Sequence, residues 1–165
     1  MPITPLLRES YLVMIRKSVG SRLFQSFIAR DGKRSRDILE NGRLSCAAFV
    51  SWILHHFGLI AEPHATVNGT VEDLAASGWK RISRPRPGAV LLWSGIRYPD
   101  GEMHRHIGFF LGGKTAVSNS TATRRPVRHH WTFGAKKGAP RRPVENIFFH
   151  PMLAGRKTPS THHPQ

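Results

Sequence analysis

The chain has 165 residues, with 25 Lys and Arg against 10 Asp and Glu, which gives a formal net charge of +15. This length suits one folded domain. A hydrophobic content of 39% is too high for a wholly disordered chain. No stretch approaches the roughly 20 apolar residues of a membrane-spanning helix. The single cysteine excludes an internal disulfide bond and any zinc site built on paired cysteines.

The positive charge is concentrated toward the C-terminus. Nine of the Lys and Arg residues, against Glu145 as the one acid, lie in the last 45 residues. Such a field attracts polyanions, such as nucleic acid or the anionic polymers of a bacterial wall, without choosing among them. The alternative is a basic surface that only keeps the protein soluble.

The N-terminal residues lack the pattern of a Sec export signal. The apolar run over residues 11–15 is short, is followed by Arg16 and Lys17, and has no small-residue cleavage site. We therefore expect no Sec signal, and a chain that is cytoplasmic at synthesis. Release or export by another route stays open.

Apolar residues recur at helical spacing over residues 6–28, and Gly20 with Ser21 predicts a break or kink. We interpret residues 1–30 as an N-terminal helical extension. Residues 30–36 read as a polar, basic connection, and residues 35–40 as a single helical turn.

The clearest helix follows Ser45. Ser45 is a suitable N-cap, apolar residues follow at helical spacing from Phe49 to Phe57, and Gly58 stands where a glycine cap belongs. A smaller helix is predicted over residues 70–77.

The period then changes to that of strands. Strands are predicted over residues 89–93, 106–111, 115–119 and 144–150, with a tight turn at Gly112-Gly113. Residues 121–143 read as a long basic loop. Helices followed by an antiparallel meander predict an α+β fold. We assign residues 31–152 to the main domain and residues 153–165 to a disordered basic tail.

Three residues in the predicted helix and strands could together form a nucleophilic site. Cys46 falls in the first turn of the predicted helix, where the helix dipole is expected to lower its pKa below about 8.5. His106 opens a strand and could act as the base. Asn119 or Ser118, on the paired strand, could orient the imidazole ring, as in a Cys-His-Asn triad.

The segments LSCAAFVSWILHHFG, PRPGAVLLW and HRHIGFFLGGKTAVSNS resemble the NlpC-type and CHAP-type cysteine peptidases. The resemblance covers about residues 41–120. It implies a papain-like fold with the cysteine at the start of a buried helix packed on a small antiparallel sheet. It also implies Cys46 as nucleophile, His106 as base and Asn119 as third polar residue. Such enzymes hydrolyse amide bonds in peptidoglycan, without a metal or other cofactor.

This sequence departs from the family pattern at several positions. Ser45 stands where many members have Asp, and two alanines follow Cys46 in place of Ser-Gly. The third triad position is often His in the family, and here it falls on Asn119 or Ser118. The resemblance therefore specifies the nucleophile better than the bond that is cleaved.

Other interpretations compete for the same residues. A lone cysteine is often an inert core residue, and His104 could serve as the base or as a cleft wall. Asn41 could donate to an oxyanion, although Asn-Gly is usually a turn. His104 and His106, with Asp100, Glu102 and the His129-His130 pair, could suggest a metal site, but no recognisable ligand motif supports one and we expect none.

Two functions follow. The first is a cysteine-dependent amide hydrolase, acting on peptidoglycan or another peptide amide through Cys46, His106 and Asn119. The second is a basic protein that binds nucleic acid or wall polymer on a catalytically inactive scaffold.

Overall fold

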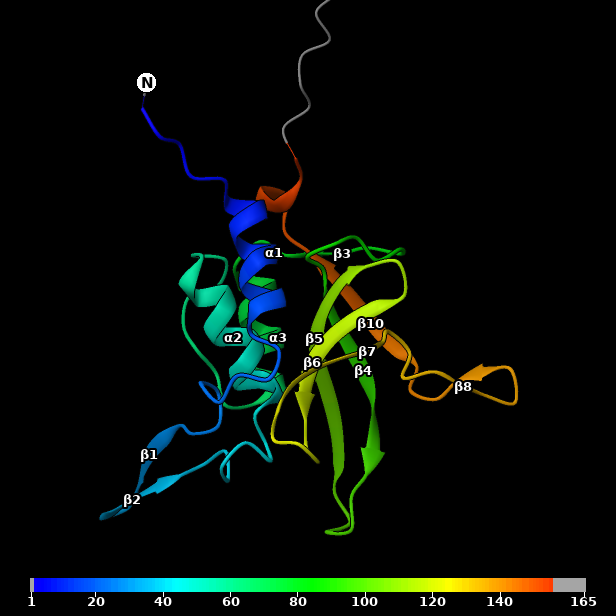
Figure 1. Cartoon of the computed structure of the whole chain (residues 1–165). Helices are drawn as coiled ribbons and strands as arrows, with labels where there is room; N and C mark the ends of the chain where they lie inside the picture. The colour runs from blue at the N-terminus through cyan, green and yellow to red at the C-terminus, as the bar shows by residue number, and fades with distance from the viewer. Residues whose placement is uncertain (1, 156–165) are drawn as a thin grey trace, which may run out of the picture.

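Three helices cover one face of a six-stranded antiparallel sheet in the computed structural model, which describes residues 2–155 (Figure 1). The α+β class is therefore as predicted. The helices are α1 (Leu7–Lys17), α2 (Cys46–His56) and α3 (Val67–Ala76). In spatial order the strands are β3 (Lys80–Arg81), β10 (Val144–Phe149), β4 (Val90–Arg97), β5 (Met103–Gly112), β6 (Thr115–Ser120) and β7 (Arg125–His130).

The first helix is part of the common core. Tyr11 and Ile15 are fully buried, and the Tyr11 hydroxyl donates a hydrogen bond of 2.9 Å to the Gly88 carbonyl. The helical pattern was predicted to continue to residue 28, but no helix is formed over residues 18–27. Gly20 has a φ of +79°, outside the helical region, and its N–H bonds to the Pro126 carbonyl. A tertiary hydrogen bond thus replaces the helical one.

The second helix begins and ends almost as predicted. Ser45 precedes it, and Gly58 follows its end with a φ of +66°, a conformation that favours glycine. The Phe49 ring meets the Phe109 ring edge-on at 5.4 Å, and this contact packs α2 onto β5. The start of α2 is thereby held against the sheet.

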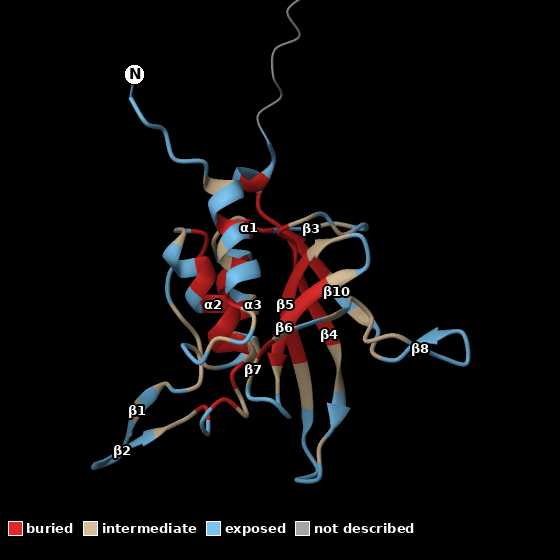
Figure 2. Ribbon diagram, viewed as in Figure 1, coloured by how far each residue is buried: buried red, intermediate tan, exposed pale blue. Residues whose placement is uncertain are grey.

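Buried residues concentrate where the helices meet the sheet, as Figure 2 shows. Two hairpins lie outside this core and are mostly exposed. The first comprises β1 (Ile28–Asp31) and β2 (Arg34–Asp37), and the second β8 (Ala135–Lys136) and β9 (Ala139–Pro140).

Two predictions fail in these regions. Residues 34–37 form a strand instead of part of a helical turn, and the predicted long loop contains β7, β8 and β9. Both β1–β2 and β8–β9 expose nearly all their side chains, so no apolar alternation marks them in the sequence.

The C-terminal boundary also differs from the prediction. Leu153 is buried in a short 3₁₀ turn, η1 (Pro151–Leu153), so the folded region extends past residue 152. The rest of the predicted tail, from residue 156, lies outside the described residues. Within residues 2–155 no helix combines the length and apolar character needed to cross a membrane.

The alternation of side chains along β5, β6 and β7 positions the candidate site. Gly108 lies opposite Ser118, and Ala116 lies opposite His129. Because successive strand residues point to opposite faces, His106, Ser118 and His129 share one face of the sheet. At Gly108, the strands β5 and β6 and the Trp93 ring pack too closely for any side chain. A Cβ there would lie 2.6 Å from the Val117 carbonyl oxygen and 2.9 Å from the Trp93 ring.

Candidate active site

Cys46 is the first residue of α2 and is partly exposed, whereas the alanines that follow it are buried. Ser45 precedes it as the N-cap, but its buried hydroxyl makes no hydrogen bond to the helix. The backbone N–H groups of the first turn therefore lack a side-chain cap. They form the positive end of the helix beside the Cys46 sulfur.

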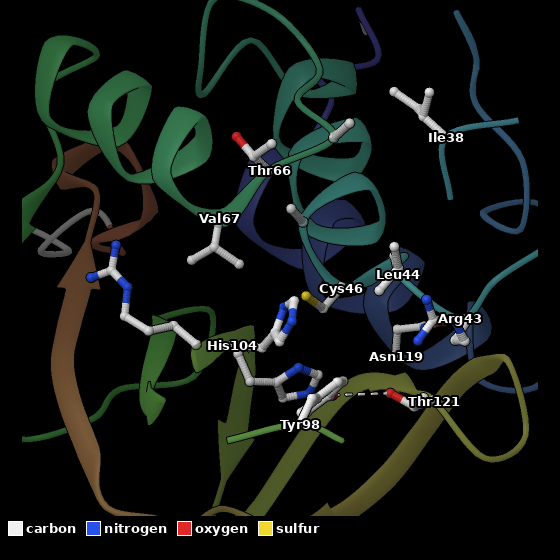
Figure 3. Close-up of a pocket in the computed structure, with 14 residues that line it drawn as sticks. Ile38, Arg43, Leu44, Cys46, Thr66, Val67, Tyr98, His104, Asn119 and Thr121 are labelled. Carbon is white, nitrogen blue, oxygen red and sulfur yellow. Dashed lines mark hydrogen bonds between the residues drawn. The ribbon is translucent and has the colours of Figure 1, made fainter. Parts of the chain in front are cut away.

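A pocket of about 330 Å³ opens in front of Cys46. In Figure 3, Thr66 and Val67 lie on one side of the sulfur, and Tyr98 and Thr121 lie on the opposite side. The lining residues come from the loop before α2, the start of α2, the loop that leads into α3 and its first residue, the turn between β4 and β5, strands β5 and β6, and the residue after β6. They are Ile38, Arg43, Leu44, Cys46, Ala47, Ala65, Thr66, Val67, Tyr98, His104, Arg105, His106, Asn119 and Thr121.

His106 lines the same pocket and is nearly buried. Its ring lies 5.5 Å from the Trp93 ring and 5.8 Å from the Phe133 ring. Burial, the nearby Arg142 and His129 together lower the pKa of His106 from 6.5 to about 3. The imidazole is therefore neutral at physiological pH and carries a lone pair that can accept a proton.

Ser118 holds the ring of His106. The distance between His106 Nε2 and Ser118 Oγ is 2.8 Å, and Ser118 Oγ lies another 2.8 Å from His129 Nε2. Of the two predicted candidates for this contact, the structure brings Ser118 to His106. His129 continues the chain.

The prediction that Asn119 orients the His106 ring is wrong. Asn119 lines the pocket, but its side-chain N–H donates to the Gly42 carbonyl at 2.8 Å. The physical reason is the strand alternation, which points Asn119 away from the face that carries His106. Asn119 instead ties β6 to the loop that leads into Cys46.

The expected lowering of the Cys46 pKa is also wrong. The residue as a whole is partly exposed, but burial of its sulfur raises the pKa of the Cys46 thiol. The backbone N–H groups of Ile107 and Ala47 and the Arg142 charge act in the opposite direction and favour the thiolate. Desolvation outweighs the helix terminus here. Cys46 is therefore a neutral thiol that shares its pocket with a neutral imidazole. Within residues 2–155 no hydrogen bond joins the Cys46 side chain to His106.

Arg142 was not singled out by the sequence and lies close to both groups. Its guanidinium donates to the Ser94 carbonyl at 3.0 Å and to the His104 carbonyl at 2.8 Å. These bonds fix a cation beside the site, so Arg142 is not free to bind a polyanion. In the sequence Arg142 is one of several neighbouring basic residues, and nothing there indicates that it is held as a cation beside Cys46 and His106.

His104 and Asn41, the alternative candidates for the site, occupy different surroundings. His104 lines the pocket with its ring centroid 4.4 Å from that of Tyr98, and its Nε2 lies 3.5 Å from Asp100 Oδ2. Asn41 is exposed in a turn with a φ of +51°. Among residues 2–155, no group of three or more His, Cys, Asp or Glu side chains is arranged to hold a metal ion.

Comparisons with known proteins add no family to this geometry. No protein-family model matches the chain, and no curated protein matches it.

Proposed function

We propose that the protein is a cysteine-dependent amide hydrolase whose substrate is the peptide part of peptidoglycan or a related peptide amide. The observation that carries this proposal is the shared pocket of Cys46 and His106, with the His106 ring held by Ser118. A nucleophile, a base and a group that orients the base are the parts that acyl transfer needs. The motif resemblance supports a papain-like version of the fold and the peptidoglycan substrate class.

The neutral state of both groups defines the first step. The Cys46 thiol gives its proton to the free ring nitrogen of His106 as the sulfur attacks the carbonyl carbon of the scissile amide. The negative charge that develops on the carbonyl oxygen faces the free N–H groups of the first turn of α2. Arg142 and these N–H groups favour the thiolate as it forms.

The second step releases the amine. His106 returns the proton to the leaving nitrogen, the C–N bond breaks, and an acyl group remains on the Cys46 sulfur. Water then attacks this thioester, with His106 taking the proton of the water and returning it to the sulfur. The products are a carboxylic acid and an amine, and Cys46 and His106 end as they began.

The test uses purified peptidoglycan and mass spectrometry of the released fragments. Wild type should release new amine and carboxylate ends, and Cys46→Ala should release none. His106→Gln should be at least about 10²-fold slower, because proton transfer is lost. His55→Gln is the matched control, since His55 is an exposed histidine at the far end of the same helix. Equal release by wild type and Cys46→Ala would overturn the proposal.

The second candidate function, binding of nucleic acid or wall polymer on an inactive scaffold, is favoured by the exposed hairpins. The β1–β2 hairpin exposes Arg30, Lys33, Arg34 and Arg36, and the β8–β9 region exposes further Lys and Arg side chains. An electrophilic amide probe separates the two functions, because Cys46 is the single cysteine. Selective labelling that depends on His106 supports the hydrolase, and its absence supports the binding protein.

A further inference from the structure

The hydrogen bonds behind His106 form a chain whose direction is set at its far end. His129 Nδ1 lies 2.8 Å from the backbone carbonyl oxygen of His130. A carbonyl oxygen only accepts, so His129 Nδ1 must carry the hydrogen. In the neutral ring, His129 Nε2 is then a bare acceptor.

The hydrogen on His129 Nδ1 determines the donors and acceptors in the other two hydrogen bonds. The Ser118 hydroxyl has one hydrogen, which it donates to His129 Nε2 across 2.8 Å. Ser118 Oγ is then left as the acceptor for His106, so His106 Nε2 carries the hydrogen in their 2.8 Å bond. His106 Nδ1 is consequently bare. This is the nitrogen with the lone pair that a general base requires.

We propose that His129 is a positioning residue, which acts through the Ser118 hydroxyl to hold His106 as the Nε2–H tautomer and takes up the charge when a proton arrives at His106 Nδ1. The catalytic consequence rests on the proposed function, whereas the tautomer and the proton shift do not.

The proton shift balances atom by atom. One proton binds His106 Nδ1, the hydrogen of His106 Nε2 moves to Ser118 Oγ, and the hydrogen of Ser118 moves to His129 Nε2. His106 ends neutral as the Nδ1–H tautomer, Ser118 ends as a hydroxyl, and His129 ends as the imidazolium. Reversal of the three movements delivers the proton back to a leaving amine. Acid has the same effect, so protonation of His129 removes the base.

The surroundings of the two rings favour the positive charge of the imidazolium on His129 rather than on His106. His106 is nearly buried between Trp93 and Phe133, and its titratable or charged neighbours are Arg142, His129 and the Cys46 thiol. His129 is more exposed than His106, its ring stacks on Phe133 at 4.0 Å, and its Nδ1–H already bonds a carbonyl.

Among the described residues, three titratable or charged side chains lie around His129. They are the imidazole of the adjacent His130, the ring of His106 across Ser118, and Arg142, which lies over the other partner of the stack, Phe133, at 5.9 Å. Burial and His130 lower the pKa of His129, whereas its bond to the His130 carbonyl raises it. The pKa of His106 falls further, to about 3, so the two rings differ in the direction that the proton shift requires.

Nitrogen-15 NMR of the two imidazole rings in the full-length protein tests the proposal without any substrate. At pH 8 we expect His106 as the Nε2–H tautomer and His129 as the Nδ1–H tautomer. As the pH falls, His129 should become the imidazolium while His106 changes to the Nδ1–H tautomer with the same midpoint. An Nδ1–H tautomer of His106 at pH 8, or independent titration of the rings, would overturn the proposal.

Two variants separate this role from a merely structural one. In His129→Gln, the amide oxygen of the introduced glutamine can accept from Ser118 but cannot take up a proton. His106 should then keep the Nε2–H tautomer one pH unit below the wild-type midpoint, where about 90% of the wild-type rings have switched. Ser118→Ala should uncouple the two titrations. His130→Gln is the control, because the backbone carbonyl at this position remains. The two rings should still titrate with one common midpoint, which moves upward because His130 lowers the pKa of His129.

These outcomes are distinguishable from a failure of the proposed function. A protein that shows the coupled titration but hydrolyses no amide retains this inference and loses the hydrolase proposal. A protein that hydrolyses amides with uncoupled rings loses this inference alone.

Discussion

Asp73 on α3 anchors the loop that forms one wall of the pocket, and its replacement should reveal how strongly. The Asp73 carboxylate is 8% exposed and accepts hydrogen bonds from the N–H groups of Ala61 and Glu62, the His64 ring and the Ser77 hydroxyl, at 2.7–3.1 Å. Burial opposes its ionisation, yet these bonds lower the pKa of Asp73 from 3.8 to about 2.

The magnitude and the pH window follow from that pKa. The gap between 3.8 and about 2 corresponds to about 2.4 kcal/mol of folding free energy. Because the folded-state pKa is the lower one, this stabilisation is present above about pH 4 and is lost as the pH falls through about 2. For a domain of this size, 1 kcal/mol changes Tm by roughly 2–4 °C.

We expect Asp73→Asn to lower Tm at pH 7 by roughly 5–10 °C, and the difference from wild type to narrow between pH 4 and pH 2. The assay is thermal unfolding by circular dichroism from pH 1.5 to pH 7. Glu72→Gln is the control, since Glu72 is an exposed neighbour on the same helix. A Tm difference that stays constant over the whole range would refute the account of Asp73.

Three further predictions concern the site and the basic surface. Alkylation of Cys46 by iodoacetamide should rise with a midpoint above the ordinary thiol pKa of about 8.5, because burial raises the pKa of this thiol; a plateau reached below pH 8 would contradict this. Gly108→Ala should lower the free energy of unfolding, measured with denaturant, by at least about 1–3 kcal/mol and shift the NMR resonances of His106, because the added Cβ would lie 2.7 Å from the Ser118 Cβ. A variant with wild-type stability and spectra would refute this close packing. Replacing Arg30, Lys33 and Arg34 by alanine should weaken binding to duplex DNA and reduce its salt dependence, by about 0.9 in the log–log slope for each phosphate that the variant no longer neutralises; an unchanged slope would exclude the β1–β2 hairpin from polyanion binding.

The sequence by itself was sufficient for the elements whose burial leaves a periodic pattern. The α2 helix, with Ser45 before it and Gly58 after it, and the β4–β5–β6 meander were predicted because apolar side chains recur there at helical or strand spacing. The same reasoning placed Cys46 at a helix start and His106 on a strand. It failed for the hairpins, whose exposed side chains carry no such period.

Only the tertiary structure decided what surrounds the two central residues. The sequence does not distinguish which of the neighbours Ser118 and Asn119 contacts His106. Strand register places the Ser118 side chain at His106 and the Asn119 side chain at the Gly42 carbonyl. The sequence also did not predict the protonation states of Cys46 and His106. The helix start predicts a lowered pKa for Cys46, whereas the desolvation that raises it depends on how much protein packs around the sulfur. Such packing is a sum over distant segments, and local sequence does not encode it.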